Sequence, residues 1–153
     1  METVEDLFSR LEQLNEIGAA LSQEKDTDHL LEKILIAAKA ITRADGGTLY
    51  VMEPSDEGPQ SEKKMDFAYS DKRLRFAIMR TDSLGIAMGG TTGSPIPFYP
   101  IHLKGKDGKP NNKMVAAYAA LNDKTVNIAD AYSEKGFDFS GTRNFTVLSF
   151  RAA

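Results

Sequence analysis

The chain of 153 residues contains no cysteine. This excludes a structural disulfide, a thiolate nucleophile, a cysteine-ligated metal and a bilin attached through sulfur. It also agrees with a reducing compartment, so we expect a cytoplasmic protein. Long apolar runs are missing as well, and the stretch from Met114 to Leu121 is too short to cross a bilayer. The N-terminus, METVEDLF, lacks the basic and apolar parts of a signal peptide.

An excess of basic charge is also missing. The chain has 19 Lys+Arg against 22 Asp+Glu, which gives a formal net charge of −3. A nucleic-acid interface needs a basic face against the phosphates, so we expect no nucleic-acid partner and, without an apolar span, no membrane partner. The 41% apolar and 27% charged residues are ordinary for a globular protein. Length and composition together favour one domain with a real core.

Residues 113–132, KMVAAYAALNDKTVNIADAY, organise the rest of the chain. The first half predicts a helix whose apolar stripe consists of Met114, Val115, Tyr118 and Leu121. Its other positions are mostly alanine, which favours helix and allows close packing. Asn122 and Asp123 then break the pattern, and residues 125–130 alternate like a strand with one buried face. This predicts a short helix lying as a lid over a sheet.

Two helices are expected before this stretch. Residues 4–22 have an apolar seam in steps of four and three, formed by Leu7, Leu11, Leu14, Gly18 and Leu21. The seam either packs on its own domain or pairs with its copy in a second chain. Asp26 is expected to cap a second helix that ends near Thr42. That helix should pack in the core through Leu30, Leu31, Ile34, Leu35, Ala38 and Ile41.

Strands are expected at residues 48–52, 73–81 and 98–103, the last at a sheet edge because three prolines accompany it. Polar residues 54–64 predict a surface loop. The glycines of residues 83–97 favour a loop with unusual backbone angles over a phosphate cradle, since no Gly-Lys-Ser/Thr follows. The lysines of residues 104–110 predict a solvated basic loop.

Seven segments follow one another in a characteristic order and spacing: LNEIGAAL at 14–21, LLEKIL at 30–35, ADGGTLY at 44–50, LRFAI at 74–78, DSLG at 82–85, TVNIAD at 125–130 and GFDFSGT at 136–142. Together they resemble a GAF domain, and the resemblance covers residues 10–145. This family is the small-molecule sensory module of cyclic-nucleotide phosphodiesterases, adenylate cyclases, sensor kinases and related bacterial regulators.

The resemblance implies an α+β fold, with an antiparallel sheet that carries N-terminal helices on one face. On the other face, a short lid helix closes over a ligand pocket. The chain would then be one domain over 1–153, with a dimerisation helix at 1–25, a GAF core at 26–145 and a divergent end at 146–153. Family members continue with two more strands, whereas this chain changes to TVLSFRAA and stops. Either residues 146–150 form a substitute strand or a second chain completes the sheet.

The resemblance also implies a pocket that holds a purine or a similar planar ring. The matching positions are Thr48, Tyr50, Arg80, Thr81, Ser83, Val115, Ala116, Ala119, Asp130, Tyr132, Phe139 and Thr142. Arg80 can bind a phosphate bidentately, but it can also serve as a surface salt-bridge partner. His29 and His102 lack further ligands at metal spacing, so we expect no haem, no metal and no other cofactor.

The leading functional hypothesis is a non-catalytic sensory domain of a signal-transduction protein. It would bind a cyclic nucleotide or a similar metabolite and change the pairing of its N-terminal helices in a homodimer. The alternative is a dimerisation scaffold without a ligand. A GAF-fold methionine sulfoxide reductase would need cysteine nucleophiles, which are absent, and no Ser/His/Asp or paired-carboxylate setting is recognisable. We therefore expect no enzyme.

Overall fold

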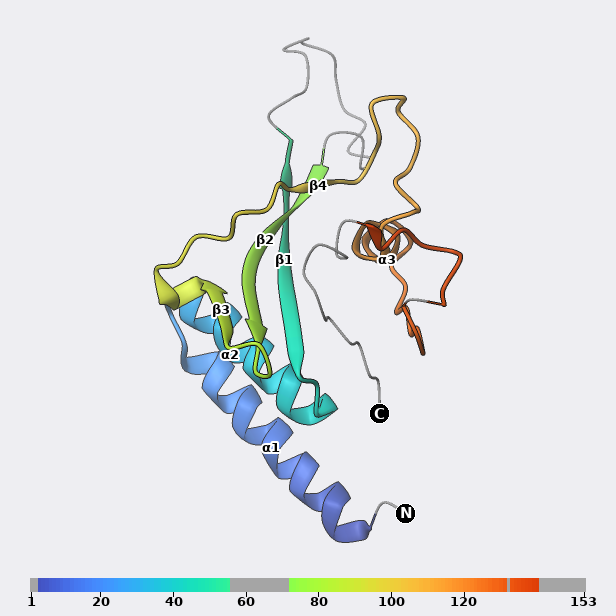
Figure 1. The fold of residues 1–153 in the computed structure, drawn as a ribbon. Helices are drawn as coiled ribbons and strands as arrows, with labels where there is room; N and C mark the ends of the chain where they lie inside the picture. The colour runs from blue at the N-terminus through green and yellow to red at the C-terminus, as the bar shows by residue number, and fades with distance from the viewer. Residues whose placement is uncertain (1–2, 56–71, 132, 141–153) are drawn as a thin grey trace. The chain divides into compact units, whose positions relative to one another are not determined.

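The computed structural model describes residues 3–55, 72–131 and 133–140. These residues form three α-helices, one short 3-10 helix and a four-stranded sheet whose determined pairings are antiparallel (Figure 1). The expected α+β class is thereby confirmed at the level of mixed helix and antiparallel sheet. The chain divides into two compact units, which we describe separately. The first contains Met1–Leu49 and Ala77–Pro97, and the second contains Tyr50–Phe76 and Phe98–Ala152.

The first unit begins with two helices, α1 (Val4–Gln23) and α2 (Thr27–Thr42). Thr3 and Asp6 form a capping box at the start of α1, which satisfies backbone N–H groups that the helix cannot bond itself. Asp26 caps α2 by accepting a hydrogen bond from the His29 N–H at 3.0 Å. Both helices therefore occupy the predicted ranges. Neither they nor any other helix of the described residues is long and apolar enough to cross a membrane.

The buried stripe of α2 is narrower than the sequence predicts. Leu35 is buried, but Ile34 and Ala38, which were expected on the core face, are exposed. Leu35 packs closely on the backbone of Gly47. A Cβ added at Gly47 would lie 2.8 Å from the Leu35 Cδ1. A helix that lies this close to a strand buries the one row of side chains that faces the strand. Side chains in the neighbouring rows of the helix point past the edges of the strand.

The sheet contains β1 (Gly46–Pro54), β2 (Lys72–Thr81), β3 (Ile86–Gly89) and β4 (Ile101–His102). In the first unit β2 pairs with β3, with Thr81 opposite Ile86. In the second unit it pairs with β4, with Leu74 opposite Ile101. The first two predicted strands are confirmed, and both are longer than expected.

Two strand expectations need correction. The strand expected at residues 98–103 is reduced to Ile101–His102, because the proline-rich segment before it has few N–H groups to give to a ladder. Residues 83–97 were expected to be a loop, yet they contain β3 and a 3-10 turn, η1 (Gly90–Thr92). The predicted unusual backbone angles are confirmed, since φ is positive at Gly85, Gly89, Gly90 and Gly93.

The second unit has its core between strand residues and α3 (Val115–Asn122). The buried cluster consists of Leu74, Ile101, Leu103 and Ala117. Helix α3 ends where Asp123 adopts a left-handed conformation with φ of 49°, so the predicted helix and its termination are confirmed.

Residues 125–130 do not form the predicted strand. Val126 and Ile128 are half-buried between exposed neighbours, so the expected alternation is present. Alternating burial occurs in any extended segment packed on one side, whereas a strand also requires a neighbour for its backbone hydrogen bonds. Predictions for residues 56–64 and 146–150 lie outside the described part of the chain.

Candidate functional site

The candidate residues are distributed over both units. The first unit holds Thr48, Arg80, Thr81 and Ser83. The second unit holds Tyr50, Val115, Ala116, Ala119, Asp130 and Phe139. Tyr132 and Thr142 lie outside the described residues. Each group is described within its own unit.

In the first unit, Arg80 is engaged by protein groups. Its Nη2 donates to the carboxylate of Glu32 on α2, and its Nη1 donates to the carbonyls of Met79 and Met88 at 2.9 Å each. The two side chains of this ion pair are only 12% and 17% exposed. The guanidinium edge that would face a phosphate is therefore occupied, and the salt bridge is mostly shielded from water instead of lying on the surface.

Glu32 also holds the turn that follows β3. Its second carboxylate oxygen accepts hydrogen bonds from the hydroxyl and the backbone N–H of Thr91. The Thr91 hydroxyl, followed by Arg80, holds the pKa of Glu32 below its usual range, because both interactions favour the ionised form. Glu32 thus ties α2 to β2 and η1. Its role was not predicted, since its partners are remote in sequence.

The end of β2 forms a second polar cluster in this unit. Asp45 accepts hydrogen bonds from the backbone N–H of Ser83 at 2.9 Å and from its hydroxyl at 2.6 Å. These bonds lower the pKa of Asp45. Lys39 reaches Asp82 at 2.6 Å. Thr81 is buried beside this turn and Thr48 is half-buried. These contacts fasten the turn between β2 and β3.

In the second unit, Tyr50 belongs to an aromatic row. Its ring centroid lies 4.8 Å from that of Phe76, which lies 5.3 Å from that of Phe98. Burial raises the pKa of the Tyr50 hydroxyl, and we find no hydrogen bond from this hydroxyl to any described residue. The rings are tilted to one another by 56° and 52°, so the row offers single ring faces for stacking, with one polar end at the Tyr50 hydroxyl. Neither phenylalanine was predicted as a site residue.

Helix α3 presents small side chains in the same unit. Ala117 is fully buried in the core, while Ala116 and Ala120 pack against the cluster that Tyr50 and Phe76 also contact. Val115 and Ala119 are half-buried. The structure thus brings Tyr50 and Ala116 to one cluster. Small side chains bring the helix backbone close to its neighbours, as the sequence predicts.

The remaining candidates lie after α3. Asp130 is exposed and accepts a hydrogen bond from the Ser133 hydroxyl at 2.6 Å, which closes a local turn. Phe139 is half-buried. Beside them, Tyr118 of α3 packs edge-on against Phe137, with ring centroids 5.3 Å apart. This aromatic contact links α3 to the following segment.

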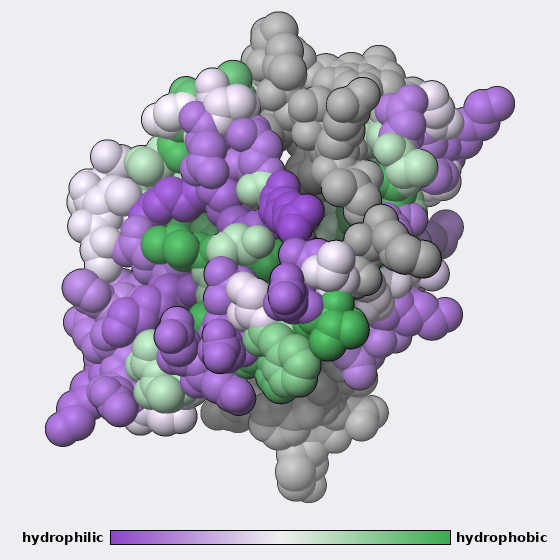
Figure 2. All heavy atoms as spheres, turned by 90° about the horizontal axis from the view of Figure 1, so that it is seen from below, coloured by the Kyte–Doolittle hydropathy of each residue, from purple (hydrophilic) through white to green (hydrophobic). Residues whose placement is uncertain are grey.

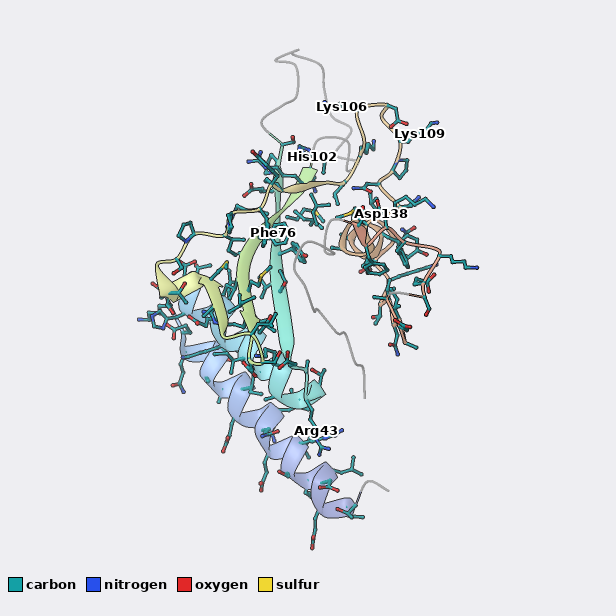
Figure 3. The ribbon with its side chains drawn as sticks, in the orientation of Figure 1. Arg43, Phe76, His102, Lys106, Lys109 and Asp138 are labelled. Atoms are coloured by element: carbon teal, nitrogen blue, oxygen red, sulfur yellow. The ribbon has the colours of Figure 1, made fainter. Side chains whose placement is uncertain are left out.

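Charged groups of the second unit are mostly paired or exposed. Glu53 of β1 binds Arg73 and Arg75 of β2 at 2.9 and 3.0 Å. Lys106 and Lys109 lie on the loop after β4 (Figure 3), and the side chain of Lys109 is 81% exposed. His102 lies 3.5 Å from the Ser55 hydroxyl. In residues 3–55, 72–131 and 133–140, no three His, Asp or Glu side chains gather as a metal site would require.

These observations define a class only at the level of the fold, a mixed α-helical and antiparallel β-sheet protein. Comparison adds no closer relation: no family model, no curated protein and no solved structure matches the chain.

Proposed function

We propose that this chain is a non-catalytic sensory domain of the GAF type, which binds a planar small molecule in its second unit. The observation that carries the proposal is the pairing of an alanine-lined helix with an aromatic row on one apolar cluster. Ligand pockets are mostly apolar and have few polar groups to fix orientation. Tyr50 supplies both features, since its ring packs on Phe76 and its hydroxyl has no partner among the described residues.

The proposed ligand is a nucleobase, a cyclic nucleotide or a similar flat metabolite. Its ring would lie against Tyr50 and Phe76, next to the small side chains of Ala116 and Ala119. Arg80 is left out of this proposal, because Glu32 and two carbonyls already occupy its guanidinium. A phosphate group of the ligand would therefore need hydrogen-bond donors other than the Arg80 guanidinium.

A second candidate, a dimerisation scaffold, is favoured by the surface of α1. Large apolar side chains are exposed along this helix, with exposed fractions of 67% for Val4, 54% for Leu7, 63% for Phe8, 53% for Leu11 and 50% for Leu14. Apolar patches lie among hydrophilic ones on the face shown in Figure 2. A stripe at heptad spacing fits a copy of itself in a homodimer. The two candidates are compatible, because a sensor can signal through such a pair.

The ligand proposal is tested by thermal unfolding against a panel of cyclic nucleotides, nucleobases and flat metabolites. Binding to the native state alone raises its stability by about 2.7 kcal/mol at 100 times the dissociation constant, so the melting temperature should rise and saturate. Ala119→Leu adds volume on α3 and should weaken the response. Ala20→Leu on α1 is the matched control and should leave it unchanged. No response across the panel would leave the scaffold as the function.

A further inference from the structure

The two edges of the sheet differ in how they are protected against pairing with another chain. On one edge, β3 ends at Gly89 with φ of 73°, and three prolines precede the two-residue strand β4. Proline lacks an N–H, and short or bent strands offer few bonds in a row. This edge therefore carries the devices that natural proteins use to prevent strand addition.

The other edge is β1, which stands at the end of the strand order β1-β2-β3. Within the described residues its only strand partner is β2. It is nine residues long, and its segment GGTLYVM contains no charge and no proline. Strands without these features are templates for a further strand, because alternate N–H and C=O groups point away from the sheet.

We propose that β1 pairs antiparallel with β1 of a second copy of this chain, which extends the sheet across a two-fold axis. If the axis passes at Tyr50, Leu49 lies opposite Val51 and Thr48 lies opposite Met52. These are apolar and β-branched pairs of the kind that stabilise sheets. No like charges meet, because Glu53 lies opposite Gly47 and is already held by Arg73 and Arg75. The strand is thus complementary to itself.

A second copy is favoured over a charged peptide partner by the same composition. An uncharged strand offers backbone hydrogen bonds and apolar side chains, which a strand of equal character matches best. The inference does not depend on ligand binding or on the pairing of α1. Its rival is a strand supplied by the chain's own residues 141–153.

The absence of cysteine allows a direct test with single-cysteine variants. Directly opposite residues in an antiparallel pair have Cα atoms about 4.5–5.5 Å apart, a separation that a disulfide can bridge. Full-length Thr48→Cys and Met52→Cys are mixed and oxidised, and the mixed disulfide dimer is quantified by mass spectrometry. Pairing at an effective concentration of ~1 mM predicts cross-linking about 100-fold faster than chance encounter at ~10 μM. Ala87→Cys on β3 is the control and should cross-link at the chance rate.

The experiment is repeated in a Leu7→Lys/Leu14→Lys background, which disables pairing through α1. Persistence of the β1 cross-link there supports the proposal whatever the fate of the helix dimer. A dimer that cross-links through Leu11→Cys on α1 but not through β1 overturns it and leaves the proposed function intact. A monomer at millimolar concentration by light scattering also overturns it. Protection of outward-facing β1 amides in that monomer would assign the edge to the chain's own terminal residues.

Discussion

At the scale of single residues, Glu32 is the side chain that joins α2 to both β2 and η1, through Arg80 and Thr91, although it was not singled out in the sequence. We expect Glu32→Gln to lower the free energy of unfolding at pH 7 by about 2 kcal/mol, because a mostly buried guanidinium loses its anion. The measurement is urea denaturation. Lys33→Gln is the control, since it removes a salt bridge whose lysine is 46% exposed and should change stability far less.

The same pair predicts a dependence on pH. The folded pKa of Glu32 lies below its ordinary value of 4.5, so the stability it contributes is fully present above that value. This stability is lost as the pH falls through the lower, folded pKa. The difference between the wild-type chain and Glu32→Gln should therefore be constant near neutrality and shrink in acid. A difference that grows below pH 4.5 would contradict the assignment.

Two glycines with similar backbone angles allow the stability cost of backbone strain to be distinguished from the cost of a steric clash. A Cβ on Gly89 would lie 2.1 Å from the carbonyl oxygen of Ala77, whereas a Cβ on Gly93 meets nothing within 4 Å. Both have positive φ, 73° and 70°. We expect Gly93→Ala to cost about 1 kcal/mol from backbone strain alone, and Gly89→Ala to cost clearly more. Equal losses in urea denaturation would mean that β3 moves away from β2 without cost.

At the scale of elements, α1 offers the clearest prediction. Leu7→Lys/Leu14→Lys should lower the average mass measured by sedimentation, because charge enters the exposed apolar stripe. Both leucines are about half exposed, so the single chain should keep its helix content by circular dichroism. Ser9→Lys/Gln13→Lys adds the same charge to exposed polar positions of the helix. If both double variants lower the mass equally, net charge and not the stripe controls association.

The elements also show what a sequence can predict. The helices follow from local signals, such as the capping box of Thr3 and Asp6, the cap at Asp26 and the break at Asp123. Strands depend on partners that are distant in the chain. Residues 125–130 show the alternating burial of a strand but form no ladder with a neighbouring strand. Strand β3 was not predicted, because the glycines around it indicated a loop.

The candidate site shows the same division between local and distant information. The alanine-rich character of α3 was readable from composition, and so was its close packing on the core. The engagement of Arg80 was not, because Glu32 lies 48 positions earlier in the chain. Phe76 and Phe98 were missed for the same reason, since the aromatic row appears only when the segment before β4 is placed beside β2.

At the scale of the whole molecule, charge is unevenly distributed although the net charge is only −3. Helix α1 is acidic, whereas residues 104–113 are basic through Lys104, Lys106, Lys109 and Lys113. If these opposite charges joined copies head to tail, salt would separate them. The surfaces proposed for association, the α1 stripe and residues 46–52 of β1, contain no charged side chain.

We therefore expect association to survive high salt. Raising the salt from about 0.1 M to about 1 M shortens the Debye length from ~10 Å to ~3 Å, which removes attraction between exposed charges. The average mass by light scattering should stay constant, and sulfate should raise it, because excluded salts strengthen apolar burial. Lys106→Glu/Lys109→Glu should likewise leave the mass unchanged. A mass that falls with salt and with this charge reversal would place the contact on the basic loop, and neither the helix stripe nor the strand edge would then be the main interface.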